Sequence, residues 1–390
     1  MDFDLTAEQQ EIRKVAREFA LGEIAPVASR HDETGEFPHA IVKKLGELGF
    51  MGVLVPPEYG GVGLDYVSYA LIVEELNRVD GSVGITMWAH NSLCTNHINL
   101  FGTKVQKGKY LGRLARGEAI GAWGLTEPGS GSDAAAMKST AVRQGEHFVL
   151  NGTKAFITNG SVGQIAVVMA LTDPARGAKG ISAFILEKGM PGFSPGQRYA
   201  KLGLHASDTS ELVFDGARVP AENLLGELNL GFVNTLQVLE GGRIAMAAMG
   251  VGLAQGALDA SLAYVKQRTA FGKTLAEFDG IQGMLAEMAT DIEAARLLTL
   301  RAAYLKDRGQ PARHAASMAK VFASEVGMRA ATRAVQLHGG AGYMREFPVE
   351  RIFRDVKLCE IGEGTSEVQR MVIAREILGL RCVSRACSMT

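Results

Sequence analysis

The sequence predicts a mainly α-helical protein with a central β domain, in the order helices, strands, helices. Apolar residues recur at helical spacing in the first and last thirds of the chain, and short apolar runs bounded by glycine, proline or aspartate fill the middle third. The length of 390 residues also exceeds the roughly 250–300 at which a single core stops growing. We therefore expect an N-terminal α-helical domain at residues 1–120, a central β domain at 121–230 and a C-terminal α-helical bundle at 231–390.

The first domain opens with an amphipathic helix. Thr6-Ala7-Glu8-Gln9 has the residue types of a capping box. Apolar residues follow at helical spacing at Ile12, Val15, Ala16 and Phe19. Pro26 is expected to end this helix, because proline inside a helix removes a backbone hydrogen bond. Further helices are expected to about Gly117.

The middle domain carries a strong turn signal. Asn151-Gly152 lies between two apolar segments, residues 147–150 and 154–157, and both residue types readily adopt positive φ. This pattern predicts a tight hairpin. Further strands are expected from the apolar runs at Ile165 to Ala170, Ile181 to Leu186 and Glu211 to Phe214.

The last domain returns to helical spacing from about Gly231. Few helix breakers precede Pro311, and one apolar stripe is formed by Met284, Leu285, Met288, Ile292 and Ala295. The run from Ala245 to Gly250 is rich in small residues, which let helix axes approach closely. These features predict a tight bundle, which small residues would also allow to continue across subunits.

The overall composition narrows the classes of function. Lys plus Arg number 41 and Asp plus Glu number 42, so the net charge is −1 and nucleic acid is not an expected partner. The acidic start, residues 1–5, is unlike a basic leader, and no apolar run approaches the ~18 residues of a membrane span. A soluble, cytoplasmic protein is expected. The cysteines are too few and too scattered for a disulfide framework or a zinc motif, and we expect free thiols at Cys94, Cys359, Cys382 and Cys387.

Four polar, glycine-rich segments are the candidate functional sites, at residues 125–133, 156–160, 336–343 and 360–366. Motifs for nicotinamide, nucleotide, zinc or serine-hydrolase chemistry are missing, and no metal site is predicted. Such loops offer backbone N–H groups and hydroxyls to an anionic or heteroaromatic ligand. Each also has a structural explanation when taken alone: a domain linker, a strand end, a turn that ends a helix, and a surface glutamate.

Together and in this order, these segments resemble the acyl-CoA dehydrogenase family over nearly the whole chain. The matching motifs are Thr-Glu-Pro-Gly-x-Gly-Ser-Asp at 126–133, Ile-Thr-Asn-Gly at 157–160, Arg-Thr-Ala-Phe-Gly at 268–272, residues 336–343 and Glu-Gly-Thr-Ser-Glu at 363–367. The resemblance implies the α–β–α fold of that family, FAD as cofactor and a homo-oligomer, normally a tetramer. It also implies an acyl-CoA substrate and electron-transferring flavoprotein as acceptor, in fatty acid or branched-chain amino acid catabolism.

The resemblance assigns two groups of residues to FAD. The Thr126 loop and Phe156 to Thr158 would lie against the isoalloxazine ring, with the Thr158 hydroxyl near flavin N5. A second group matches positions that hold the FAD of a neighbouring subunit, namely Arg268, Phe271, Gln336 and Gly340. The whole implied set is Leu125, Thr126, Gly131, Ser132, Phe156, Thr158, Arg268, Phe271, Gln336, Gly340, Thr365 and Glu367.

The resemblance also implies the chemistry. A carboxylate removes a proton from Cα while a hydride moves from Cβ to flavin N5, which gives a trans-2-enoyl-CoA. The family places this carboxylate either at the position of Glu363 or directly before a recurrent arginine. That arginine is Arg243 here and Gly242 precedes it, so Glu363 is the implied base. Arg243 would lie beside the base near substrate, although arginine is usually a helix-surface cation, and Ser132 would contact the CoA chain.

The expectation about the substrate depends on Gly362. Many straight-chain members carry a tyrosine at the matching position, so glycine would widen the pocket beside Cα and Cβ. Residues 359–362 also look like isovaleryl-CoA dehydrogenase, which uses the alternative base position. A short, branched or cyclic acyl group is therefore expected. A straight-chain short or medium acyl-CoA dehydrogenase, an oxygen-using acyl-CoA oxidase and a non-catalytic acyl-CoA-binding relative remain as alternatives.

Overall fold

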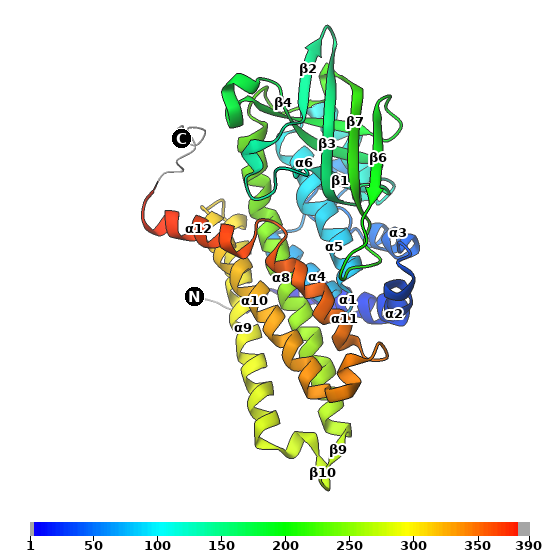
Figure 1. Cartoon of the computed structure of the whole chain (residues 1–390), viewed down its shortest axis with the longest axis vertical. Coiled ribbons are helices and arrows are strands. Elements are labelled where there is room, and N and C mark those ends of the chain that lie inside the picture. The colour runs from blue at the N-terminus through cyan, green and yellow to red at the C-terminus, as the bar shows by residue number, and fades with distance from the viewer. Residues whose placement is uncertain (1–3, 381–390) are drawn as a thin grey trace.

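The computed structural model describes residues 4–380, which begin with a group of helices (Figure 1). These are α1 (Ala7–Phe19), α2 (Ala25–Thr34), α3 (His39–Glu47), α4 (Tyr66–Asn77), α5 (Gly81–Ala89), α6 (Asn96–Phe101) and α7 (Lys104–Ala115). The predicted capping box of α1 is present: the Thr6 hydroxyl accepts from the Gln9 N–H at 3.2 Å, and the Gln9 side chain accepts from the Thr6 N–H at 3.1 Å. Both bonds satisfy N–H groups that a helix start leaves unpaired.

The expected end of the first helical segment at Pro26 is wrong. A π turn at Ala20–Ile24 follows α1, and α2 then begins with Pro26 in its first turn. Proline is tolerated there because the N–H groups of the first turn have no partner inside the helix. The chain stays helical to Thr34 and leaves the helix at Gly35, whose φ is 65°.

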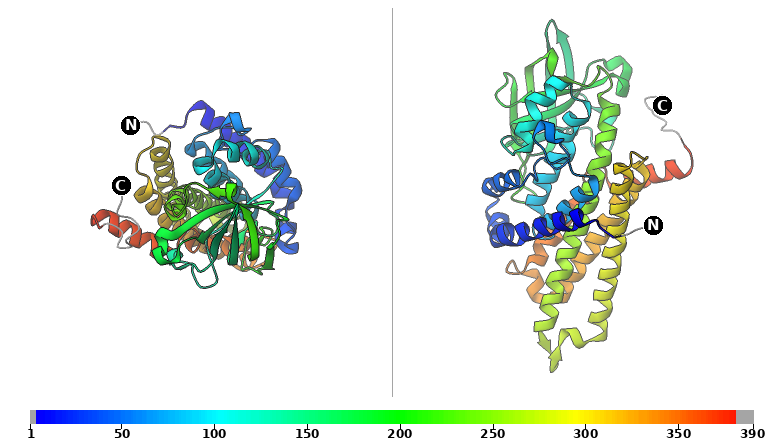
Figure 2. Two further views of the ribbon diagram at one scale, coloured as in Figure 1. Left: turned by 90° about the horizontal axis from the view of Figure 1, so that it is seen from above. Right: turned by 180° about the vertical axis from the view of Figure 1, so that it is seen from behind.

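The strands form one main sheet at one end of the molecule (Figure 1 and Figure 2). They are β1 (Gly121–Gly124), β2 (Thr140–Gln144), β3 (His147–Thr158), β4 (Ile165–Leu171), β5 (Ile181–Glu187), β6 (Phe193–Arg198), β7 (Thr209–Pro220) and β8 (Leu224–Leu225). The order across the sheet is β6-β7-β3-β2-β4-β5-β8, and β1 pairs with β4. The three predicted apolar runs are confirmed as β4, β5 and part of β7.

The predicted hairpin turn at Asn151-Gly152 is wrong. Both residues lie inside β3, and the turn between β2 and β3 falls at residues 145–146. The register of β3 against β7 shifts between Leu150 and Gly152, which identifies a β-bulge. Gly152 has a φ of 137°, and the Asn151 side-chain oxygen accepts a hydrogen bond from the Gly216 N–H at 2.9 Å. The conformational freedom that suggested a turn serves the bulge instead.

The last part of the described chain is a helical bundle. α8 (Gly231–Gln267), α9 (Asp279–Asp307) and α10 (Arg313–His338) pack together, and α11 (Pro348–Val356) and α12 (Ser366–Ile377) follow. The short pair β9 (Thr269–Ala270) and β10 (Lys273–Thr274) joins α8 to α9 at the end remote from the main sheet (Figure 1). Met288, Ile292 and Ala295 of the predicted stripe are buried. A side-chain carbon at Gly250 would lie 2.9 Å from the Ala323 carbonyl oxygen, so the small residue allows α8 and α10 to approach closely.

α8 is the one described helix that is long and apolar enough to cross a membrane, by length and composition alone. However, 83% of its most apolar window is buried inside the protein, as expected of a core helix. Cys94 and Cys359 are free and buried, whereas Cys382, Cys387 and the acidic start at residues 1–3 lie outside the described residues. Between residues 4 and 380, no cluster of His, Cys, Asp and Glu could hold a metal ion.

Candidate active site

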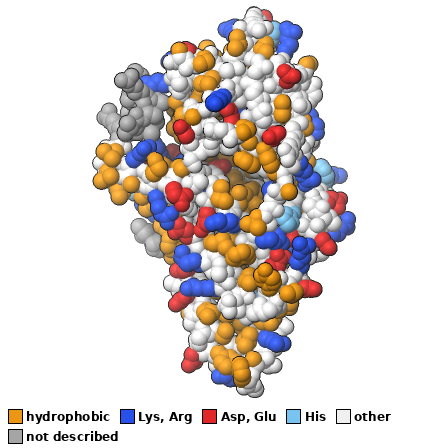
Figure 3. Space-filling model, viewed as in Figure 1, with side chains coloured by type: hydrophobic (Ala, Val, Ile, Leu, Met, Phe, Trp, Pro, Cys, Tyr) orange, Lys and Arg blue, Asp and Glu red, His pale blue; other side chains and the backbone are white. Residues whose placement is uncertain are grey.

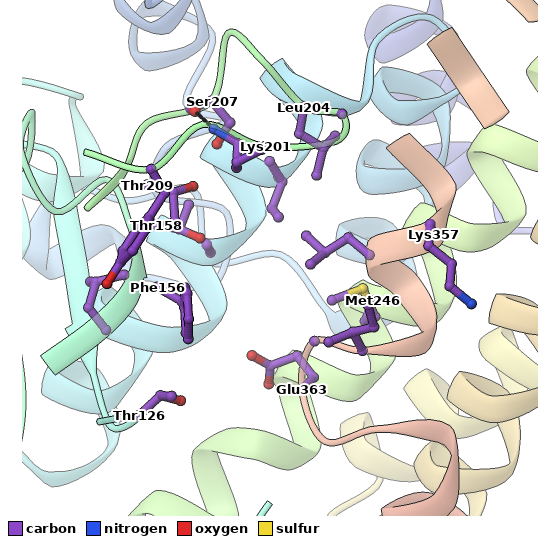
Figure 4. A pocket seen from close by; sticks show the side chains of 18 of the residues that line it. Thr126, Phe156, Thr158, Lys201, Leu204, Ser207, Thr209, Met246, Lys357 and Glu363 are labelled. Carbon is purple, nitrogen blue, oxygen red and sulfur yellow. Dashed lines mark hydrogen bonds between the residues drawn. The ribbon is translucent and has the colours of Figure 1, made fainter. Parts of the chain in front are cut away.

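A pocket of about 640 Å³ lies where the main sheet, α5, α8 and the segment before α12 meet. Figure 3 shows the hollow on this face with apolar side chains inside it, and Figure 4 shows the side chains that line it. A mostly apolar cavity with a few polar groups is typical of a small-molecule site. The predicted site residues that line it are Leu125, Thr126, Gly131, Ser132, Phe156, Thr158, Gly362, Glu363 and Thr365.

Glu363 stands in a loop whose backbone is strained and firmly held. Glu363 (φ 57°) and Gly364 (φ 88°) are both left-handed, which is uncommon for a glutamate. The Gln369 side chain donates hydrogen bonds to the carbonyl oxygens of Glu363 (2.9 Å) and Gly364 (3.1 Å). The buried Lys320 of α10 donates to the Gly364 carbonyl at 2.7 Å, and Thr365 caps α12. Contacts from two helices therefore fix an unfavourable conformation, as often occurs at functional positions.

The Glu363 carboxylate projects into the pocket (Figure 4). The residue as a whole is only partly buried, but its Oε2 atom is fully buried and has no hydrogen-bond partner among residues 4–380. A side-chain carbon at Gly242 would lie 2.2 Å from Oε2, so this glycine of α8 leaves room for the carboxylate. Burial raises the pKa of Glu363 to about 7, although the charges of Arg243 and Lys320 act to lower it. A desolvated carboxylate with a pKa near neutrality is suited to accept a proton.

Arg243 follows Gly242 on α8 and is buried, so the interpretation as a helix-surface cation is wrong. Its Nε atom is buried and unpaired, and within the described part of the chain the Arg243 side chain makes no hydrogen bond or ion pair. Burial lowers the pKa of Arg243 and the charge of Glu363 opposes that change. A buried guanidinium with free donors is costly. The charge of Arg243 therefore favours the ionised form of Glu363, but Arg243 itself is not among the residues that line the pocket.

The wall that faces Glu363 comes from the end of β3 and the loop after β1 (Figure 4). Phe156 has a φ of 59° and is 62% exposed, and its ring lies 4.8 Å from that of Tyr199. Positive φ in a bulky residue is a genuine outlier. The hydroxyls of Thr126, Ser132 and Thr158 have no hydrogen-bond partner in the described chain. This wall offers an aromatic face and free hydroxyls to a ligand.

The remaining predicted cofactor residues do not line the pocket of their own chain. Arg268 and Phe271 lie at the β9–β10 pair, and Gln336 and Gly340 lie at the end of α10, toward the far end of the bundle (Figure 1). Phe271 is 96% exposed and has a φ of 52°. Glu367 is exposed in the first turn of α12.

Some residues that line the pocket were not predicted from the sequence, among them Trp88, Trp123, Lys201 and Met246. The signal for Met246 was available, because it lies one helical turn after Gly242 and therefore on the same face of α8. Its Cε would be 2.7 Å from a side-chain carbon at Gly362. The end of the Met246 side chain therefore occupies space that Gly362 leaves, and a pocket widened by Gly362 stays a prediction.

Three consecutive parts of the chain match one enzyme family. Residues 6–118 match the N-terminal domain of acyl-CoA dehydrogenases, residues 122–217 the middle domain and residues 229–378 the C-terminal domain. The chain therefore belongs to the acyl-CoA dehydrogenase family of oxidoreductases, which are FAD-dependent.

Three individual proteins illustrate what this chain is similar to within the family. The chain is 50% identical over 377 residues to the short-chain specific acyl-CoA dehydrogenase of Clostridium acetobutylicum, covering 97% of this chain and 100% of that protein. It is similar to butyryl-CoA dehydrogenase from Megasphaera elsdenii, with a TM-score of 0.95 and 46% identity over 97% of this chain and 100% of that one. It is also similar to a structure described as "Electron transferring flavoprotein of Acidaminococcus fermentans: Towards a mechanism of flavin-based electron bifurcation". That match has a TM-score of 0.96 and 49% identity over 97% of this chain and 100% of that one.

The pocket residues fit FAD. The exposed Phe156 ring can stack against a planar heteroaromatic ring, and the unpaired hydroxyls of Thr126 and Thr158 can bond to its nitrogen and oxygen atoms. The residues that would hold the isoalloxazine are therefore those of the wall opposite Glu363. The other side of the pocket, next to the carboxylate, then remains open.

Proposed function

We propose that this protein oxidises a short, straight-chain acyl-CoA to the trans-2-enoyl-CoA and passes the electrons to an electron-transferring flavoprotein. The observation that carries the proposal is the Glu363 carboxylate, which is unpaired and lies across the pocket from Phe156 and Thr158. An acyl thioester between these walls would have a base on one side and the cofactor-binding wall on the other. That arrangement suits removal of one hydrogen from Cα and one from Cβ.

Glu363 would supply two groups to this reaction. Its carboxylate takes the Cα proton, and the electron pair of that C–H bond forms the Cα–Cβ double bond as a hydride leaves Cβ. FAD, when bound, supplies the acceptor for that hydride. The backbone N–H of Glu363 has no hydrogen-bond partner in the described chain, so it can donate to the thioester carbonyl oxygen, where negative charge develops. Arg243 supports the reaction by favouring the ionised base.

A short, unbranched acyl group is supported by two observations. The relatives described above are a short-chain specific enzyme and a butyryl-CoA dehydrogenase. In addition, Met246 occupies the space beside Gly362 that a branch would need. Neither observation supports the branched or cyclic substrate expected from Gly362 alone.

The chain would complete its cofactor site with a second copy of itself. Arg268, Phe271, Gln336 and Gly340 lie outside the pocket, and Phe271 is almost fully exposed, so these residues are free to reach the FAD of a neighbouring subunit. A homo-oligomer, normally a tetramer in this family, would bring these residues to that site. The similarity to the electron-transferring flavoprotein structure supports the same class of protein as electron acceptor.

A panel of straight, branched and cyclic acyl-CoAs tests the proposal. Each thioester is mixed without oxygen with the FAD-loaded protein, and flavin bleaching is followed. We expect butyryl-CoA to bleach the flavin fastest. A flavin that stays oxidised with every thioester would refute the proposal, and reoxidation by air as rapid as by electron-transferring flavoprotein would favour the oxidase alternative.

The pH dependence of flavin reduction should report the protonation of Glu363. Burial raises its pKa to about 7, so below that pH the carboxyl group is protonated and cannot accept the Cα proton. We expect kcat/KM for butyryl-CoA to fall about tenfold per pH unit below this value and to be constant above it. Arg243→Gln should move the midpoint to higher pH, because Arg243 lowers this pKa. A midpoint at the ordinary value of 4.5 would contradict the desolvation of the base.

A further inference from the structure

Met246 and Gly362 meet beside the catalytic carboxylate. The methyl end of Met246 lies 2.7 Å from the place where a side chain at Gly362 would begin. Both residues line the pocket, and Figure 4 shows Met246 next to Glu363. A long side chain from α8 therefore takes the volume that a larger residue at 362 would otherwise take.

Met246 lies close to the place where the Cα and Cβ atoms of the substrate would bind. It lies one turn after Gly242 on the same face of α8, and Gly242 is the residue over which the Glu363 carboxylate rests. Leu358 and Leu93 complete the apolar wall around this point, and both line the pocket. A carbon at Gly362 would be 3.8 Å from Leu358 Cγ, and one at Gly242 would be 3.1 Å from Leu93 Cδ2. A substrate carbon that gives its proton to Glu363 would lie against this wall.

We propose that Met246 is the residue that determines acyl specificity, by closing the space beside Gly362 so that an unbranched chain fits next to Glu363 and a methyl branch near Cα or Cβ does not. This inference rests on the proposed function and names the structural cause of its substrate class. Glycine at 362 thus does not by itself define a wide pocket. Met246 and Gly362 together determine the width of the pocket at this point.

The physical cost of a branch explains how one side chain can set this preference. Met246 is almost fully buried, with 1% of its surface exposed, so a branch can enter only if the thioether moves into a packed core. One methylene in an apolar enzyme pocket changes kcat/KM by about 10–200-fold. Replacing Met246 by alanine removes the Cγ, Sδ and Cε atoms and should open room for one such branch.

The experiment compares Met246→Ala with the unchanged protein and with Met288→Ala, each loaded with FAD. Met288 is equally buried, lies on α9 and does not line the pocket. The readout is kcat/KM for isovaleryl-CoA relative to butyryl-CoA. We expect this ratio to rise about tenfold or more in Met246→Ala and to stay unchanged in Met288→Ala. An unchanged ratio in Met246→Ala would overturn the inference, whereas failure of butyryl-CoA to reduce the unchanged protein would refute the proposed function instead.

Gly362→Ala provides a second variant that does not depend on the stability of Met246→Ala. Alone, its new methyl group would force the flexible end of Met246 to shift within the pocket, which should lower kcat/KM for butyryl-CoA. Combined with Met246→Ala or with the milder Met246→Val, the need for this shift is removed and activity should recover. Recovery of activity in the double variant supports direct contact between the side chains at 246 and 362. If the losses of the two single variants simply add in the double variant, the inference is overturned.

Discussion

Glu363→Gln is expected to lower the rate of flavin reduction by butyryl-CoA by about 10²–10⁴-fold, the usual contribution of a general base. Glutamine keeps the size of the side chain but cannot accept the Cα proton. The loop should remain in place, because Gln369 and Lys320 hold it through the carbonyl oxygens of residues 363 and 364 and not through the carboxylate. Stopped-flow measurement of flavin absorbance after mixing with the thioester gives the rate.

Glu360→Gln is the matched control. Glu360 belongs to the same segment, pairs with Lys357 and does not line the pocket. The control should retain the rate of the unchanged protein, and both variants should bind FAD and shift its spectrum on binding acyl-CoA. Near-normal flavin reduction by the variant at 363 would show that another group removes the proton.

The fold was predicted most accurately where several sequence signals agreed. The start of α1, for example, combines a capping box with an apolar stripe. The two errors came from single signals, the dipeptide Asn151-Gly152 and the lone Pro26. Each is compatible with more than one backbone setting, a turn or a bulge in one case and a helix end or a helix start in the other. Asn151-Gly152 forms a bulge because β3 pairs with β7 on both sides of it. Pro26 lies at a helix start because the chain continues as α2 after it.

The candidate site was predictable for residues in glycine-rich loops but not for those on regular helices. Glu363 could be predicted because it lies in a recognisable sequence motif, although its burial and raised pKa depend on tertiary packing. Met246 and Lys320 read as core positions of α8 and α10, and only the packing of these helices brings them to the loop of the base. The left-handed backbone of Phe156 is likewise invisible in sequence, because phenylalanine rarely adopts it.

Gly242→Ala is expected to lower the rate of flavin reduction about 10²-fold, the loss that a misplacement of roughly 1 Å can cause at a reacting group. The new methyl carbon would lie 2.2 Å from Oε2 of Glu363, far inside contact distance, so the carboxylate must move. Helix stability should not suffer, since alanine is favoured over glycine in a helix by about 1 kcal/mol. Comparison of flavin reduction rates and unfolding temperatures separates the two effects.

A second substitution decides whether the alanine acts through the base. Aspartate at 363 is one methylene shorter and would withdraw the carboxylate from the new methyl group, so Gly242→Ala combined with Glu363→Asp should be faster than the product of the two single losses predicts. Gly283→Ala on α9 is the control, because a side chain there meets no atom within 4 Å and the rate should be retained. If the losses in the double variant simply multiply, the alanine disturbs the packing of α8 and not the position of the carboxylate. Coupling between positions 242 and 363 would instead show why glycine is required before Arg243. The Glu363 carboxylate occupies the space that a side chain at 242 would need.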